Sequence, residues 1–213
     1  MKRVLCYGDS NTWGWNPQNT ERYGEQDRWT GVLQNELGAE YKIIEEGLNG
    51  RTTVWEDPIE GFKSGKTYLI PCLETHKPLD LVIAMLGSND LKKRFSLSAF
   101  DIAQGMSTIL EMIIRSQTGI GGQSPKLLCV APPPIGRMTI VGHIDFSEMF
   151  EGAEEKSRKL AHYYRQFASL CGCEFLDASQ IVVPSEIDGI HLDISEHKKL
   201  AQAIAPVVRK IIG

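Results

Sequence analysis

The stretch "LDLVIAMLGSND", residues 79–90, decides the fold class. Within it, Leu81 to Leu86 form an unbroken apolar run, which Gly87 ends and polar residues follow. A run without alternating polar positions is typical of a strand that helices cover on both faces, as in parallel sheets. Polar side chains directly after such a strand lie at its carboxyl end, where open parallel sheets bind their ligands. The stretch therefore predicts a fold class and also where a site should lie.

Strand-like and helix-like segments alternate on both sides of this stretch. Further strands are predicted at 3–7, 41–47, 126–131 and 173–178, and helices at 28–37, 98–115, 154–171 and 195–212. Ser98 and Asp101 at the front of the second helix predict a capped, amphipathic helix. The alternation favours right-handed crossovers and an α/β fold, a three-layer α/β/α sandwich around a parallel sheet, in a single domain over residues 1–213.

Composition narrows the classes of function. The chain has 213 residues, a formal net charge of −4 and interspersed acids and bases, so no nucleic-acid partner is expected. No apolar stretch approaches the ~18 residues of a membrane span. The five cysteines are an odd number and form no C-x-x-C pair, which favours free thiols in a reducing compartment and therefore a cytoplasmic protein. No cofactor is expected.

Four polar clusters fall at or near the predicted carboxyl edge of the sheet. Ser10 lies in "GDSN", Gly50 in "NGRTT", Asn89 in "GSND", and Asp188 and His191 in "DGIH". Acyl transfer needs a serine, an imidazole to take its proton, a carboxylate to orient the imidazole, and N–H donors for the oxyanion. Each short motif alone is typical of a turn. Their occurrence together, with Ser, Asp and His in that order, favours a serine hydrolase.

Two other classes of function stay open at this point. Asp188, His191, Asp193 and His197 offer nitrogen and oxygen ligands for a metal enzyme, although solvated charges at a helix start explain the last two equally well. A flavodoxin-like binding module that holds a small ligand without turnover is the non-enzyme alternative. A binding module leaves the joint occurrence of serine, histidine, aspartate and asparagine unexplained, so an enzyme is favoured. No metal site is assigned.

Two motif-like stretches are interpreted as structure rather than as sites. "GFKSGKT", residues 61–67, has three residues between its glycines where a phosphate-binding loop has four, so a lysine-rich surface turn is expected. "SEHK", residues 195–198, lacks the companion motifs of penicillin-binding enzymes, so Ser195 is expected to cap the last helix.

With these residues the chain resembles the SGNH hydrolases, also called the GDSL family of lipases and esterases. The four name-giving residues are Ser10, Gly50, Asn89 and His191, in the order of the family. The resemblance implies a flavodoxin-like SGNH hydrolase fold, with Ser10 as nucleophile and His191 as general base oriented by Asp188. It also implies an oxyanion hole made by the Ser10 N–H, the Gly50 N–H and the Asn89 side chain.

Longer blocks resemble the arylesterase and acyltransferase branch of that family. These are "YGDSNTWGW", "RWTGVL", "EEGLNGRTT", "AMLGSND" and "FEGAEEK". The resemblance implies a homo-oligomer that hydrolyses small aryl or short-chain acyl esters, with acyl transfer as a side activity. Asn11 stands where the older family name has leucine, and Gly50 stands where the acyltransferase relative has alanine. Gly50 keeps its N–H, so hydrolysis is expected, whereas acetylated sugars and thioesters stay open as alternative substrates.

The substrate is expected to meet Asp9 and Trp13, which flank the serine motif. Trp13 lies one helical turn from Ser10, where an aromatic ring is placed to wall an apolar pocket. Packing in a loop or core explains Trp13 and Trp15 equally well. Two long irregular stretches, Asn16–Asp27 and Arg137–Gly152, are typical of functional walls or interface segments.

Overall fold

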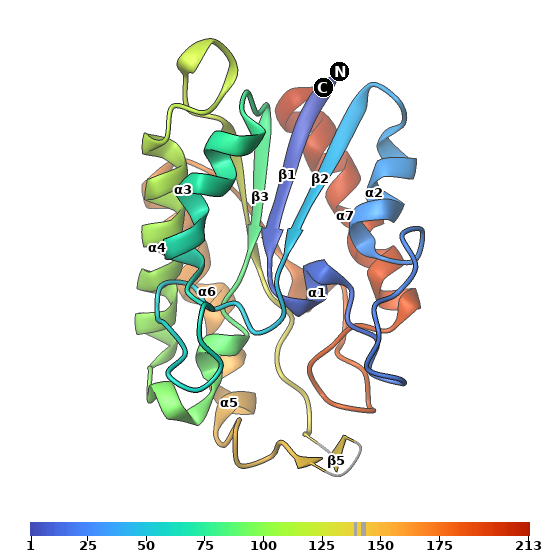
Figure 1. The fold of residues 1–213 in the computed structure, drawn as a ribbon, viewed down its shortest axis with the longest axis vertical. Helices are drawn as coiled ribbons and strands as arrows, with labels where there is room; N and C mark the ends of the chain where they lie inside the picture. Colours follow the sequence, from blue (N-terminus) through green and yellow to red (C-terminus); the bar gives the residue numbers. More distant parts are fainter. Residues whose placement is uncertain (139, 142–143) are drawn as a thin grey trace.

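Five parallel strands form one sheet in the order β2–β1–β3–β4–β7 (Figure 1). The computed structural model describes residues 1–138, 140–141 and 144–213. The strands are β1 Lys2–Gly8, β2 Tyr41–Gly47, β3 Leu81–Met85, β4 Lys126–Ala131 and β7 Glu174–Asp177. The apolar run that predicted a doubly covered strand is β3, whose five residues are all buried in the middle of the sheet.

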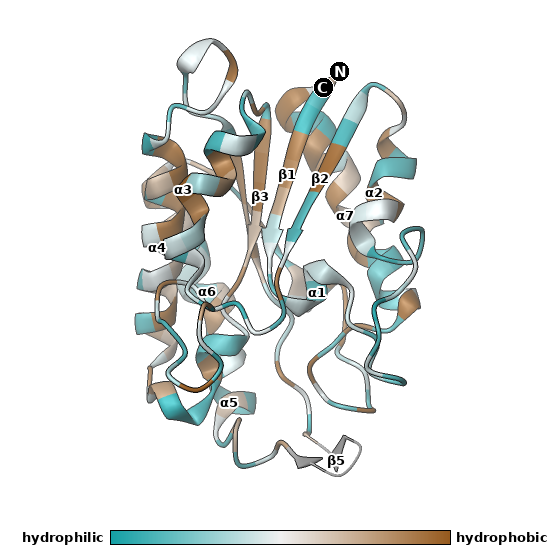
Figure 2. Ribbon diagram, in the orientation of Figure 1, coloured by the Kyte–Doolittle hydropathy of each residue, from teal (hydrophilic) through white to brown (hydrophobic). Residues whose placement is uncertain are grey.

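Helices cover both faces of the sheet, which confirms the three-layer α/β/α fold class. They are α1 Ser10–Trp13, α2 Trp29–Leu37, α3 Gly65–His76, α4 Ala99–Arg115, α5 Ala153–Ser157, α6 Leu160–Cys171 and α7 Ile194–Ile212. Helices α2 and α7 lie on one face, and α3, α4 and α6 lie on the other (Figure 1). Apolar residues concentrate in β3 and in the middle of β1 and β2, whereas the helices carry both apolar and polar residues (Figure 2).

The longest helix of the second face, α4, forms as its sequence predicts. The Asp101 N–H donates to Ser98 Oγ at 3.1 Å, and the Ser98 N–H donates to Asp101 Oδ2 at 2.9 Å. These two bonds satisfy backbone donors that a helix start otherwise leaves without partners. Ile102, Ile109 and Ile113 are fully buried on one side of the helix, so burial of this side fixes α4 against the sheet.

Helix α3 was not predicted, and the interpretation of residues 61–67 as a surface turn was wrong. Ser64 Oγ accepts the Thr67 N–H at 3.4 Å and caps the helix, so the second half of that stretch is its first turn. Lysines and the internal Pro71 obscured the pattern, because proline removes a backbone donor inside a helix. The signal that was present is the helical spacing of its buried apolar residues, Leu69, Cys72 and Leu73.

Three smaller expectations also differ from the structure. The helix expected over 154–171 is divided into α5 and α6, and the buried Ser157 hydroxyl at the division accepts the Ile135 N–H at 3.0 Å. Ser195 does not cap α7, because Asp193 occupies the cap position. The stretch expected to be irregular contains an antiparallel pair, β5 Ile140–Val141 and β6 Ile144–Asp145, while its residues 139, 142 and 143 lie outside the described residues.

The parallel strands end at one edge of the sheet, where α1 lies, and both chain termini lie at the opposite edge (Figure 1). The polar clusters that follow β1, β2 and β3 are therefore brought to one edge. Over the part of the chain that the structure describes, no helix combines the length and the apolar character that a membrane crossing requires. A single domain over residues 1–213 stays a prediction.

Candidate active site

Ser10 is positioned by a tight connection between β1 and α1. The strand ends at Gly8, Asp9 caps the helix through its side chain, and Ser10 is the first helical residue. A Cβ atom on Gly8 would lie 2.1 Å from Thr12 Oγ1, so only glycine lets the helix fold back this closely on the strand. As the first helical residue, Ser10 has no partner inside the helix for its N–H. Its side chain and its N–H are therefore both presented at the sheet edge.

Ser10, His191 and Asp188 form a hydrogen-bonded chain. His191 Nε2 lies 2.9 Å from Ser10 Oγ, although the two residues are 181 positions apart. His191 Nδ1 lies 2.6 Å from Asp188 Oδ2. Because Asp188 accepts at Nδ1, the N–H of a neutral imidazole is held on that side, and Nε2 is left to accept the serine proton.

Hydrogen bonds keep Asp188 ionised although the side chain is buried. Its Oδ1 accepts the backbone N–H groups of Ile190 and His191, each at 2.9 Å. Burial raises the pKa of Asp188, but the hydrogen bond and charge of His191, together with these two N–H groups, outweigh burial and lower the pKa below its ordinary value. The carboxylate is therefore negative where the imidazole needs an acceptor.

The loop that carries His191 is fixed from two sides. Gly189 has a φ of 72°, and a Cβ atom there would lie 2.5 Å from the Arg137 carbonyl oxygen, so the loop packs closely on the segment after β4. From the serine side, Asn11 Oδ1 accepts the Leu192 N–H at 3.1 Å and Asn11 Nδ2 donates to the Ile190 carbonyl at 3.4 Å. Asn11 thus holds the residues immediately before and after His191.

Two further N–H donors line the same cavity as Ser10. Asn89 Nδ2 donates one hydrogen to the Arg51 carbonyl at 3.2 Å, which leaves its second N–H for a ligand. Gly50 follows β2 in a left-handed conformation with a φ of 79°. Among the described residues, no hydrogen-bond partner is recorded for its N–H. The motifs after β1, β2 and β3 therefore each supply a donor to one cavity.

The cavity has a volume of about 260 Å³ and an apolar and a charged part. Ser10, Asn49, Gly50, Asn89, Asp188 and His191 line it with Trp15, Phe146, Met149, Phe150, Ile190, Glu60, Lys63 and Lys92. The Trp15 ring lies 5.5 Å from the His191 ring, centroid to centroid. Apolar side chains near the reacting groups reduce access of water and strengthen electrostatic contacts.

The charged side chains of the lining form ion pairs and hydrogen bonds with one another and with neighbouring residues. Lys92 Nζ lies 2.5 Å from Glu60 Oε1 and 3.5 Å from Asp57 Oδ2. Arg94 Nη1 binds the other oxygen of the fully buried Asp57 at 3.0 Å, and Lys63 Nζ donates to the Asn49 carbonyl at 2.8 Å. Glu60 and Lys92 were not singled out from the sequence, and Lys63 was considered only as part of the stretch 61–67, because these charges reach the cavity only through the fold.

Two buried carboxyl groups lie beneath the cavity. Asp9 Oδ1 accepts the Asn11 N–H at 3.0 Å, whereas its Oδ2 is buried without a partner in the described part of the chain. Burial raises the pKa of Asp9 to about 6, in spite of that N–H and the nearby charges of His191 and Arg51. Burial likewise raises the pKa of Asp90 to about 6, although Thr53 donates to it through its N–H and its hydroxyl.

The structure places two predicted substrate-binding residues away from the cavity lining. Asp9 is 1% exposed beneath the site, and Trp13 packs beside Trp15 and under the Arg22 guanidinium, whose Cζ lies 5.2 Å from the ring centre. Trp15, which was interpreted only as a packing residue, lines the cavity instead. Trp13 is the last residue of α1, and the left-handed Gly14, with a φ of 91°, ends the helix between the two tryptophans, so Trp15 lies beyond the helix.

The residues considered for a metal enzyme do not converge. Among the described residues, no three of Asp188, His191, Asp193 and His197 bring ligand atoms within 4.8 Å of one another. His197 is fully buried, and its Nδ1 accepts the Trp29 N–H at 3.3 Å. Burial lowers the pKa of His197 to about 3, so it is a neutral core residue.

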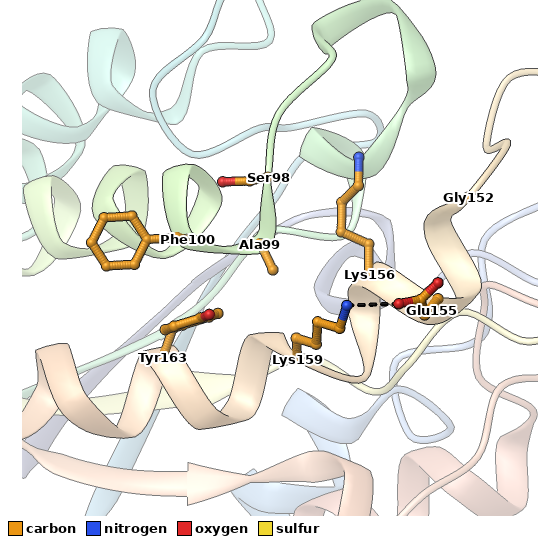
Figure 3. Close-up of a pocket in the computed structure, with 8 residues that line it drawn as sticks. All are labelled: Ser98, Ala99, Phe100, Gly152, Glu155, Lys156, Lys159 and Tyr163. Atoms are coloured by element: carbon orange, nitrogen blue, oxygen red, sulfur yellow. Dashed lines mark hydrogen bonds and ion pairs between the residues drawn. The ribbon is translucent and has the colours of Figure 1, made fainter.

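A second cavity lies between the start of α4 and helices α5 and α6 (Figure 3). Its lining residues are Ser98, Ala99, Phe100, Gly152, Glu155, Lys156, Lys159 and Tyr163. Lys159 Nζ pairs there with Glu155 Oε1 at 2.7 Å, and Ser98 already caps α4. These polar groups form an exposed ion pair and a helix cap, so the candidate active site is assigned to the cavity at Ser10.

Known structures resemble this fold over its full length. The native aryl esterase of M. smegmatis is 44% identical with a TM-score of 0.93, and the match covers 99% of this chain and 100% of that one. A carbohydrate acetylesterase from Sinorhizobium meliloti is 42% identical, with the same TM-score and 99% of both chains covered. No curated protein matched the chain. Fold, site and these relatives together define a hydrolase that acts on ester bonds.

The family model for GDSL-like lipases and acylhydrolases matches residues 6–196. The chain therefore belongs to the GDSL-like lipase/acylhydrolase family. The resemblance noted from the four motifs is thereby confirmed.

Proposed function

We propose that the protein is a serine esterase in which Ser10, His191 and Asp188 act as the catalytic triad. The observation that carries this proposal is the continuous chain from Ser10 Oγ through His191 to Asp188, with contacts of 2.9 and 2.6 Å. Both distances lie in the range over which a proton passes directly between heavy atoms.

The reaction proceeds by double displacement. Ser10 Oγ attacks the ester carbonyl carbon while its proton passes to His191 Nε2, and the imidazolium is stabilised by Asp188. The carbonyl oxygen becomes an oxyanion that accepts hydrogen bonds from the Ser10 N–H, the Gly50 N–H and Asn89 Nδ2. His191 then protonates the leaving alcohol, and an acyl-enzyme on Ser10 remains. Water attacks this ester with His191 again as base, and the acid is released.

Small carboxylic esters with an aryl or short acyl group suit the cavity. Trp15, Phe146 and Phe150 supply an aromatic lining, and a volume of about 260 Å³ lies slightly below the common range for ligand pockets. The 44% identity to an aryl esterase supports this class. Transfer of the acyl group to an alcohol is a side reaction, because any nucleophile that reaches the acyl-enzyme can replace water.

Acetylated carbohydrates are the second candidate substrate. Glu60, Lys63 and Lys92 line the same cavity, and such charged groups bind sugar hydroxyls through hydrogen bonds. The 42% identity to a carbohydrate acetylesterase supports this alternative. Comparing kcat/KM for phenyl acetate and for an acetylated sugar distinguishes the two classes.

A homo-oligomer and a cytoplasmic location belong to the same proposal. Ile59 and Phe62 are 76% and 95% exposed, as expected for apolar side chains that a second subunit covers. The five cysteines are all free, which is typical of a reducing compartment. Sedimentation velocity on the full chain measures the first, and localisation of a tagged chain in its host measures the second.

The serine mechanism is tested with p-nitrophenyl acetate and the variant Ser10→Ala. We expect kcat to fall about 10⁴-fold or more, because the members of a triad act as a unit. Ser195→Ala, at a serine outside the cavity, serves as the matched control and should keep the activity of the parent protein. A serine-directed phosphonate should attach to Ser10 alone. Near-normal turnover by Ser10→Ala would exclude the mechanism.

A further inference from the structure

Three side chains with different metal-binding chemistry meet between β2 and α3, outside the proposed catalytic set. They are Glu46 of the strand and Cys72 and His76 of the helix, and one ligand atom of each lies within 4.8 Å of the other two. Cys72 and His76 are four residues apart, so both project from the same side of α3. In the described ranges, no other group of three or more His, Cys, Asp or Glu side chains has this spacing.

The spacing of the three atoms suits a tetrahedral ion. Zinc binds thiolate sulfur at about 2.3 Å and imidazole nitrogen or carboxylate oxygen at about 2.0–2.2 Å, so its ligand atoms lie about 3.3–3.8 Å apart. His76 Nε2 and Glu46 Oε1 are 2.7 Å apart as a hydrogen-bonded pair, and a tetrahedral ion between them requires a separation larger by about 0.6–0.9 Å. Both side chains are partly exposed, at 24% and 19%, and therefore have room to move.

The three side chains differ in their exposure to solvent. Glu46 and His76 are partly exposed, whereas Cys72 is fully buried behind them. A cavity of about 480 Å³, lined by Glu46, Tyr68 and Pro71 among others, opens beside the group. An entering ion would therefore meet oxygen and nitrogen first and sulfur last, and a water molecule from the cavity side is available as fourth ligand.

Charge balance also favours a divalent ion at this position. A divalent cation would balance one carboxylate and one thiolate, and the displaced thiol proton would pass to solvent. A Glu–His pair alone is an ordinary ion pair, but the adjacent sulfur completes a set of three donors.

We propose that Glu46, Cys72 and His76 bind one Zn²⁺ ion with a water molecule as fourth ligand. A mixed sulfur, nitrogen and oxygen set suits zinc, which is intermediate between hard and soft cations. The ion would join β2 to α3. Because an ion that binds the folded state preferentially stabilises it, zinc should raise the thermal unfolding temperature of the protein.

The test titrates the reduced, metal-stripped full chain with Co²⁺ and then with Zn²⁺. One equivalent of Co²⁺ should produce visible bands of a tetrahedral ion and a near-ultraviolet thiolate charge-transfer band, and Zn²⁺ should abolish both. Loss of a ligand in Cys72→Ser or His76→Gln should weaken Zn²⁺ binding about 100-fold or more, beyond the effect of outer-shell changes. His76→Gln replaces a partly exposed side chain, which guards against a folding defect at the buried cysteine.

Two control variants locate the ion. Cys171→Ser removes another thiol that is only partly buried, and His191→Gln removes the active-site imidazole. Both variants should keep the bands and the zinc-induced rise in unfolding temperature. The proposal is overturned if the parent protein gives no thiolate band, if Cys72→Ser and His76→Gln bind as the parent does, or if His191→Gln abolishes binding. The esterase mechanism does not depend on any of these outcomes.

Discussion

Two buried aspartates at the same edge of the sheet have pKa values that are shifted in opposite directions. Asp188, in the loop of His191, has a pKa below its ordinary value, whereas Asp9, beneath Ser10, has a pKa raised to about 6. The difference lies in their donors. Asp188 accepts the imidazole N–H and two backbone N–H groups. Asp9 accepts the Asn11 N–H through one oxygen, while its other oxygen has no partner among the residues that the structure describes. Burial alone therefore does not determine the direction in which the pKa of a carboxyl group shifts.

Among the variants that test this comparison, the largest effect is expected at Asp188, which accepts the imidazole N–H. Asp188→Asn should lower kcat for p-nitrophenyl acetate by about 10³–10⁴-fold, because an amide in this place no longer holds the productive tautomer of His191. Asp9→Asn is the matched control, since it changes an equally buried carboxyl that does not touch His191, and its kcat should stay within about tenfold of the parent. Equal losses in the two variants would remove the distinction between the two regions.

The next largest effect on kcat is expected at Asn89, the N–H donor that follows β3 and lines the cavity. Asn89→Ala should lower kcat about 10²–10³-fold, the usual loss for one oxyanion donor. Steady-state kinetics separates two roles here: loss of an oxyanion donor lowers kcat, whereas loss of a ground-state contact raises KM. A change confined to KM would contradict the assignment of Asn89 to the oxyanion hole.

A smaller effect is expected at Asn11, which joins the two regions. Asn11→Ala removes both hydrogen bonds that flank His191 and leaves the buried Leu192 N–H without its partner, at a cost of about 1–3 kcal/mol. We expect kcat to fall about tenfold with little change in KM, since the imidazole is positioned less well. Asn11→Asp keeps the acceptor for Leu192 and should restore part of kcat. Parent-like kinetics in Asn11→Ala would show that Asp188 positions His191 without help.

The smallest effect on activity, at Asp9, comes with a clear effect of pH on stability. Because the folded-state pKa of about 6 exceeds the ordinary 3.8, the folded protein holds the Asp9 proton more tightly and loses stability as pH rises from about 4 through 6. Asp9→Asn removes this loss, so its free energy of unfolding relative to the parent should increase by about 2–3 kcal/mol between pH 4 and pH 7.

Asp188→Asn should show the opposite sign in the same measurement. A lowered pKa contributes stability above the ordinary pKa of the carboxyl and loses it as the pH falls through the folded value. Relative to the parent, this variant should therefore be least stable near neutral pH and recover in acid. Urea unfolding of the parent and both variants across pH 3–7 measures the two trends, and parallel curves would contradict the electrostatic comparison.

Local sequence patterns predicted much of the fold because they report burial directly. The run 81–86 gave the central strand, and Ser98 with Asp101 gave the start of α4, since apolar continuity and capping are short-range properties. Helix α3 was missed because Pro71 and the exposed Lys66 obscured the spacing of its buried residues. Its burial comes from contact with the sheet, which local propensity does not report.

The candidate site divides in the same way. Ser10, Gly50, Asn89, Asp188 and His191 were named from motifs, because each follows a strand or precedes a helix at an edge that parallel topology defines. The cavity lining was not: Trp15 replaces Trp13, and residues from distant loops complete the walls. The residues of these loops carry no shared pattern, so only their three-dimensional neighbours identify them.

By itself the sequence determined a parallel sheet with polar groups at its carboxyl edge, because the apolar runs indicate which strands are buried and in which order they follow along the chain. Only the tertiary structure decided which of those groups touch, in which direction the pKa of each aspartate shifts, and that Glu46, Cys72 and His76 meet. The physical reason is that hydrogen bonding and desolvation act between atoms a few ångströms apart, and that proximity is created by folding among residues far apart in the chain.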